Sequence, residues 1–116
     1  MIDKATLWVF MKEFIYAGIK GIIMKYGAYE PNNRQTWENI SARANEFIEN
    51  LVPLGFLHEA KIVCDNTTNT QDTVDANEFH LKFAWKVNES DEFTIVDFDL
   101  MPLSGLMVSE VSNGIE

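Results

Sequence analysis

The apolar residues of this 116-residue chain change their spacing once, and that change constrains the fold more than any other feature. Between Leu7 and Leu51 they recur every three or four positions, which is typical of helices that bury one face. After Leu57 they alternate with polar residues, which is typical of half-buried strands. Helices followed by strands predict an α+β domain, in which the helices pack on one face of a sheet.

The first part of the chain predicts two helices separated by a turn. The first covers about residues 4–24, and Pro31 prevents its continuation. The second starts after an N-cap at Asn32 or Asn33, runs to about residue 52 and has one clean apolar stripe. The first helix has a main apolar stripe of Leu7, Phe10, Met11, Phe14, Ile15, Ile22 and Tyr26. Its other faces also hold Trp8, Val9, Ile19 and Ile23, so we expect it to lie between the core and another surface.

Three strands are predicted in the second part of the chain. They cover about residues 61–65, 79–87 and 94–100, with a polar loop at 66–77. The expected fold is therefore two N-terminal helices packed on a three-stranded, mainly antiparallel sheet. We expect this domain to occupy residues 1–102 and residues 103–116 to form an extended C-terminal arm.

The arm has two possible uses. A three-stranded sheet has unpaired edges, and such edges invite pairing with another chain. The arm could complete the sheet of a neighbouring copy by strand exchange, or it could cover an edge of its own sheet. The sequence leaves both possibilities open.

The charge of the chain is unevenly distributed, although its net value is −9. Residues 1–29 carry a small positive balance, whereas residues 88–116 contain seven acidic and no basic residues. These segments are either two solvated faces of one domain or complementary surfaces in a head-to-tail assembly. The second interpretation predicts a subunit interface formed by Lys12, Lys20, Lys25, Leu106, Val108, Glu110 and Val111.

Composition argues against several classes of protein. A net charge of −9 is unsuited to neutralising phosphates, so nucleic acid is not an expected partner. Charged residues interrupt the apolar stretch of the first helix, so neither a transmembrane helix nor a signal peptide is predicted. Cys64 is the only cysteine, which excludes an intrachain disulfide and a zinc site with several thiolates.

Residues suited to catalysis are few. His58 and His80 are predicted to be solvated, and Cys64 is predicted to be a small buried residue within a strand. No phosphate-binding glycine loop, zinc-protease motif or serine-hydrolase motif occurs in the sequence. We therefore expect a protein without enzymatic activity, cofactor or metal.

Several short motifs resemble those of contractile tail sheath proteins and follow the same order. The segment YEPNNRQTW at residues 29–37 is similar to the family's "FEPN…W", and residues 55–57 (GFL) are similar to its "G-A-L". Further along, VCD at 63–65 and TNT at 68–70 are similar to its "V.CD…TNT", and DEF at 91–93 opens the last predicted strand. Together the motifs extend over about residues 5–110.

The resemblance implies a structural role in a phage or phage-like contractile tail. It is confined to the C-terminal, tube-proximal domain of a sheath subunit, without the outer domains or an N-terminal arm. In that family neighbouring subunits form sixfold rings and exchange strands. We therefore expect a hexameric ring at one end of the tail, in the neck/collar or at the baseplate. Its expected partners are other copies of itself and tail sheath, tail tube, neck or baseplate proteins. The alternative is a stand-alone protein-binding adaptor with the same fold.

Overall fold

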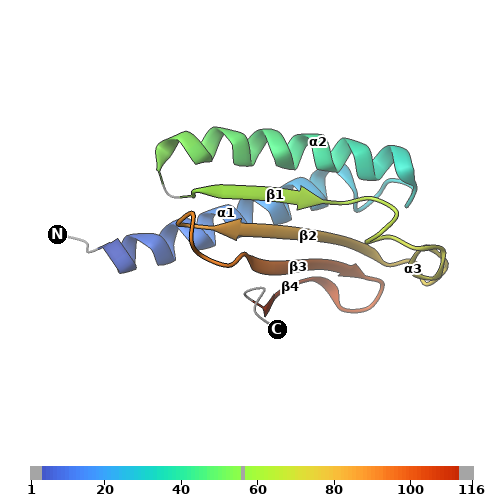
Figure 1. The fold of residues 1–116 in the computed structure, drawn as a ribbon. Helices are drawn as coiled ribbons and strands as arrows, with labels where there is room; N and C mark the ends of the chain where they lie inside the picture. The colour runs from blue at the N-terminus through green and yellow to red at the C-terminus, as the bar shows by residue number, and fades with distance from the viewer. Residues whose placement is uncertain (1–3, 56, 113–116) are drawn as a thin grey trace.

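The computed structural model describes residues 4–55 and 57–112 and has an α+β fold (Figure 1). The order of elements is helices first and strands second, with one short helix between strands. In chain order the elements are α1 (Lys4–Tyr26), α2 (Arg34–Leu51), the 3₁₀ turn η1 (Val52–Leu54), β1 (Glu59–Val63), α3 (Gln71–Asp75), β2 (Phe79–Lys86), β3 (Thr94–Met101) and β4 (Gly105–Ser112). The predicted fold class is therefore confirmed.

The sheet has four antiparallel strands in the order β1-β2-β3-β4, so the prediction of three strands with an extended arm is wrong. The segment expected to be an arm turns back after Pro102, and β4 pairs with β3, with Val108 opposite Phe98. Gly105 has a φ of 76°, a backbone conformation that glycine adopts without strain, and this allows the tight turn. The last four residues of the expected arm, 113–116, lie outside the described residues.

The other boundaries differ from the predicted ones by small shifts. Asn33, one of the two predicted candidates, is the N-cap of α2, and its side chain accepts a hydrogen bond from the Thr36 backbone N–H. β1 begins two residues earlier than expected, because Glu59 and Ala60 already pair with β2. The loop predicted at 66–77 contains α3, capped by the Thr70 side chain. Phe56, from the second family motif, lies outside the described residues.

One core lies between the two long helices and one face of the sheet. α1 contributes Ile15, Ile19 and Ile23, which have at most 1% of their surface exposed. The described exposures correct the predicted main stripe of this helix, since Phe10 and Phe14 lie on the opposite, exposed side. The remaining buried apolar residues of the core include Ile40, Ala44 and Ile48 of α2, and Leu81, Phe83, Val96 and Phe98 of the sheet.

The two long helices approach each other closely at a glycine. A Cβ atom at Gly18 of α1 would lie 2.3 Å from Cζ of Phe47 in α2. The Phe47 ring therefore occupies the space that a side chain at position 18 would need. A Cβ at Gly21, one turn further on, would meet no atom within 4 Å, so that side of α1 is open.

Two asparagines, Asn32 in the segment 29–37 and Asn69 in the segment 68–70, hold turns and strand ends in place through their side-chain amides. The Asn32 side chain donates to the Glu78 carbonyl and accepts from the Trp37 indole, both at 2.7 Å, which ties the α1–α2 turn to the start of β2. The Asn69 side chain is 2% exposed and bonds both the N–H and the C=O of His80 at 2.8 Å. These amides replace missing backbone partners at the ends of elements.

None of the described helices is long and apolar enough to cross a membrane.

Candidate assembly surfaces

β4 is joined to α1 by a small polar cluster centred on Glu110. Its carboxylate lies 2.9 Å from the Lys12 ammonium and accepts a 2.7 Å hydrogen bond from the Tyr16 hydroxyl. The Trp85 indole of β2 in turn donates to the Tyr16 oxygen at 3.3 Å. The Tyr16 ring also contacts Phe83 and Phe98 edge to face. The cluster therefore connects the edge strand to the core through α1.

The electrostatics of the cluster follow from these contacts. The hydrogen bonds from Lys12 and then Tyr16 lower the pKa of Glu110, because both stabilise the charged carboxylate. Burial raises the pKa of Tyr16, and the hydrogen bond to Glu110 raises it further. Glu110 is therefore ionised and Tyr16 is neutral near pH 7, which suits a donor–acceptor pair.

β4 is otherwise weakly embedded in the domain. Its outer edge has no strand partner among the described residues, since β4 ends the strand order. Leu106 and Val108 are partly buried against the core, while Met107 and Val111 are about half exposed. None of residues 105–111, for which burial is described, is buried. An edge strand of this kind is a template for pairing with another chain.

The outer side of α1 carries a second apolar surface. Phe10 and Phe14 are each 56% exposed, and Met24 is 44% exposed. The Phe14 ring also lies 6.0 Å from the Phe47 ring of α2, so one edge of this surface meets the second helix. Ala17 and Gly21 lie between them on the same side and are also exposed. We call these five residues, Phe10, Phe14, Ala17, Gly21 and Met24, the outer stripe of α1. Aliphatic and aromatic surface of this extent along one helix indicates a contact site rather than a solvated face.

The sheet face turned away from the helices is covered by charged pairs. Lys82 of β2 lies 3.2 Å from Asp97 of β3, and Lys86 lies 3.8 Å from Glu59 of β1. The His80 ring lies between two carboxylates, with Nδ1 2.6 Å from Asp99 and Nε2 3.1 Å from Glu78. The charges of this face are therefore largely satisfied across neighbouring strands.

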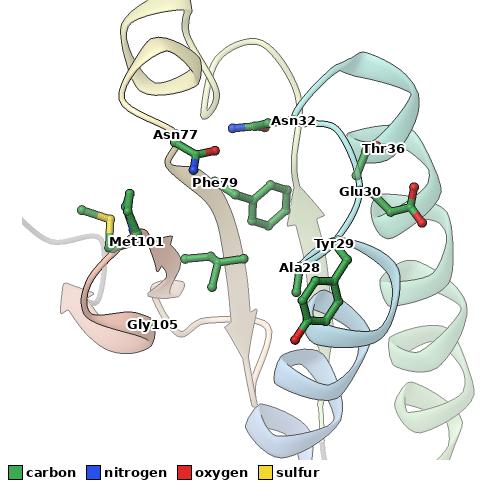
Figure 2. Close-up of a pocket in the computed structure, with 12 residues that line it drawn as sticks. Ala28, Tyr29, Glu30, Asn32, Thr36, Asn77, Phe79, Met101 and Gly105 are labelled. Carbon is green, nitrogen blue, oxygen red and sulfur yellow. The ribbon is translucent and has the colours of Figure 1, made fainter.

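A hollow lies at one end of the sheet, beside the turn that leads into β4 (Figure 2). It has a volume of about 350 Å³ and is lined by the α1–α2 turn, Phe79 and the β3–β4 turn. Tyr29 stands beside it with 96% of its surface exposed. Glu30 is the one charged residue of its lining, so the hollow offers shape and hydrogen bonds rather than acid–base chemistry.

The residues considered for catalysis lie apart in the fold. Cys64 is buried, and burial raises the pKa of its thiol to about 12, so it is protonated near pH 7. His58 is exposed in the connection before β1. Burial lowers the pKa of His80, but the hydrogen bonds to Asp99 and Glu78 outweigh it and the net shift is upward. Within residues 4–55 and 57–112, no three His, Cys, Asp or Glu side chains are grouped to hold a metal ion.

The structure brings only part of the predicted interface together. Lys12 and Glu110 pair with each other inside one chain, so the basic helix and the acidic tail already meet there. Leu106 and Val108 pack against the core, while Val111 is exposed. Lys20 and Lys25 are exposed on α1. A role for these residues between subunits stays a prediction.

Sequence reasoning missed two features of these surfaces. Phe10 and Phe14 of the outer stripe were expected in the main apolar stripe, because they share three- and four-residue spacing with Leu7, Met11 and Ile15. The spacing of the outer stripe, with intervals of four, three, four and three residues from Phe10 to Met24, was the available signal. The Tyr16 hydroxyl, 94 residues away from Glu110 in the chain, carried no local signal for its partner.

Comparison with known proteins shows similarity to tail sheath proteins. The chain is 30% identical over 74 residues to the tail sheath protein of Enterobacteria phage T4, and 28% identical over 74 residues to that of Vibrio phage KVP40. Each match covers 64% of this chain but only 11% of the relative. No protein-family profile matches the chain, and no solved structure does. The similarity supports a relationship to tail sheath proteins.

Proposed function

We propose that this chain is a structural protein of a contractile bacteriophage tail, located in the virion tail and assembled in the host cytoplasm. The observation that carries the proposal is the similarity to the tail sheath proteins of two phages. The motif residues that resemble the sheath family also fix the turns and strand ends of this fold, through Asn32 and Asn69. This supports a domain equivalent to the tube-proximal C-terminal domain of a sheath subunit, without enzymatic activity.

Strand exchange through β4 is the proposed mode of assembly. β4 contributes backbone pairing with β3 and a few half-buried side chains, and it has an open outer edge within the described part of the chain. A β4 from a neighbouring copy could make the same hydrogen bonds to β3 and place its Glu110 on the same Lys12 and Tyr16. The exchange therefore conserves almost all contacts, and main-chain hydrogen bonds provide the affinity.

The turn before β4 supports this mode because it can act as a hinge. Only residues 102–104 separate β3 from β4, and Leu103 is fully exposed. Pro102 has a fixed φ and lacks a backbone N–H, so opening the turn breaks no hydrogen bond donated by its backbone. Exchange of an identical element between copies is a low-cost route to assembly, and a short hinge beside an edge strand is a site for it.

The proposed assembly is a ring of six copies at one end of the tail, in the neck/collar or at the baseplate. The number six is taken from the sheath resemblance. The proposed partners are neighbouring copies and the sheath, tube, neck or baseplate proteins of the same particle.

Purified particles test the function directly. Mass spectrometry of intact contractile tails should detect the chain in a fixed ratio to the sheath protein, and a cryo-electron microscopy map should place it at one end. Absence from purified tails would overturn the proposal, and co-purification with a non-tail protein would favour the stand-alone adaptor.

A truncation tests the role of β4. Deleting residues 104–116 should leave α1, α2 and β1–β3 folded, as measured by circular dichroism, because none of residues 105–111 is buried. The truncated protein should no longer join the tail. A matched control, Met107→Ser, alters an exposed side chain of β4 and should assemble normally. Normal assembly of the truncated protein would show that β4 covers only its own sheet.

A further inference from the structure

We propose that the outer stripe of α1 pairs with the same stripe of a second copy, with the two helices antiparallel. This contact is separate from β4 and from the tail function. It concerns a surface on the opposite side of α1 from the core isoleucines, and it gives that surface a specific occupant.

The spacing of the stripe fits a helix as partner. The intervals between successive residues of the outer stripe alternate between four and three. This is the a/d pattern of two helices packed side by side. The stripe spans about 21 Å at 1.5 Å per residue. All five residues of the stripe are exposed, so a second helix has access to them.

The sizes of the side chains match in the antiparallel direction. With Ala17 close to the two-fold axis, Phe14 faces the partner's Gly21, and Phe10 faces the partner's Met24. Nothing lies within 4 Å of a Cβ built at Gly21, so its surface can receive an aromatic ring. Large side chains therefore oppose a small one or a flexible one along the whole contact.

The charges beside the stripe select the same direction. Glu13 and Lys20 occupy equivalent flanking positions, one heptad apart, and both are exposed. In an antiparallel pair, Glu13 lies opposite the partner's Lys20, and the two-fold axis repeats this contact. In a parallel pair, Lys20 would lie opposite the partner's Lys25, which is repulsive. Among the described residues, neither Glu13 nor Lys20 has an ion-pair partner within the chain.

The antiparallel dimer is the form of the free protein, before it joins the ring. A two-fold contact cannot be repeated around a ring whose subunits all point the same way, so the ring must use other contacts. Pairing would cover Phe10 and Phe14 until the protein joins its partners. The contact is smaller than a standard protein interface, and we expect micromolar affinity.

Charge-reversal variants test the pairing and its direction. Analytical ultracentrifugation of the full chain should show a concentration-dependent dimer. Glu13→Lys alone and Lys20→Glu alone should each raise the dimer dissociation constant by about tenfold or more, a loss of about 1.4 kcal/mol or more. An equal mixture of these two variants should form a heterodimer, and the double variant should dimerise as the original chain does. Because both residues are exposed, circular dichroism should be unchanged in every variant.

A cysteine variant locates the axis. Ala17→Cys should form a disulfide-linked dimer under mild oxidation, because the two thiols meet near the axis. The control Ser109→Cys, on the open face of the sheet, should form no disulfide-linked dimer. A monomer at all concentrations would overturn the proposal. So would failure of the mixture to form heterodimers, or cross-linking of the Ser109→Cys variant without cross-linking of the Ala17→Cys variant. The tail function would stand in each of these cases, since it rests on different residues.

Discussion

β2 and β4 are strands of equal length that flank β3 on opposite sides, and both pair with it in antiparallel register. In β2 five residues are buried: Phe79, Leu81, Phe83, Ala84 and Trp85. In β4 none of residues 105–111 is buried. The same backbone pairing therefore holds one strand inside the fold and the other at its margin.

The difference shows that strand pairing and burial have separate roles here. The free energy of burial is concentrated in β2 and β3, whose buried side chains belong to the core that the helices also form. β4 is held mainly by backbone hydrogen bonds and by Glu110, which another copy of the strand could supply equally well. We expect β2 to define the domain and β4 to be the part available for exchange.

The largest expected effect is in β2. Phe83→Ala removes a ring that is 1% exposed and leaves a cavity beside Tyr16, so we expect a loss of about 3–5 kcal/mol in the free energy of unfolding. Urea denaturation followed by circular dichroism measures this loss. If Phe83→Ala lowered the free energy of unfolding less than a β4 variant does, the proposed difference between β2 and β4 would be wrong.

The second-largest loss of stability is expected at Asn69, whose side chain holds the start of β2. Asn69→Ala leaves both the N–H and the C=O of His80 without their side-chain partner in a site that is almost closed to water. We expect a loss of about 2 kcal/mol in the free energy of unfolding. Asn66→Ala, at an exposed position of the same loop, is the matched control and should change stability little.

A smaller loss of stability is expected at Val108, a residue of β4 that packs against the core. Val108→Ala removes about two methyl groups from a partly buried position, so we expect a loss of about 1 kcal/mol. Hydrogen exchange should show β4 amides opening at a lower free energy than β2 amides, because β4 can detach without unfolding the core. Equal protection in the two strands would contradict the proposed hinge.

The smallest expected effects are in pH dependence, and they have opposite signs in the two strands. The folded pKa of Glu110 lies below its ordinary 4.5, so its stabilisation is present above pH 4.5 and is lost as pH falls through the folded pKa. The folded pKa of His80 lies above 6.5, so its stabilisation is present below pH 6.5 and is lost as pH rises through the folded pKa. Each effect should be roughly 0.5 kcal/mol after screening by solvent.

Substitutions at Glu110 and His80 test which residue causes each pH dependence of stability. Glu110→Gln should flatten the acid side of the pH profile of unfolding free energy, and His80→Gln should flatten the side above pH 6.5. An unchanged profile in either variant would show that the corresponding ion pair contributes nothing measurable.

The sequence predicted what local spacing can encode. The fold class, an N-cap at Asn32 or Asn33, and strands β2 and β3 were all accessible, because helix and strand periods differ and caps use specific side chains. The fourth strand was missed because Leu106, Val108 and Val111 alternate loosely around exposed positions. The inner and outer sides of α1 were not told apart. The spacing from Phe10 to Met24 marks a second apolar stripe, but Phe14 and Ile15 are both apolar, and only tertiary packing decides which one faces the sheet.

The most direct measurement identifies which copy supplies the β4 that pairs with a given β3. Asp97 of β3 lies opposite Ser109 of β4 on one side and opposite Lys82 of β2 on the other. Cysteines at facing positions of neighbouring strands are close enough to form a disulfide. Tails assembled with the Asp97→Cys/Ser109→Cys variant and then oxidised can be analysed by denaturing electrophoresis, with Lys82→Cys/Asp97→Cys as the control.

Strand exchange predicts covalent multimers from the β3–β4 pair of cysteines and monomers from the β2–β3 control, because β2 and β3 always belong to one chain. Monomers from both variants, with their disulfides formed, would show that each copy keeps its own β4 and would contradict the proposed assembly.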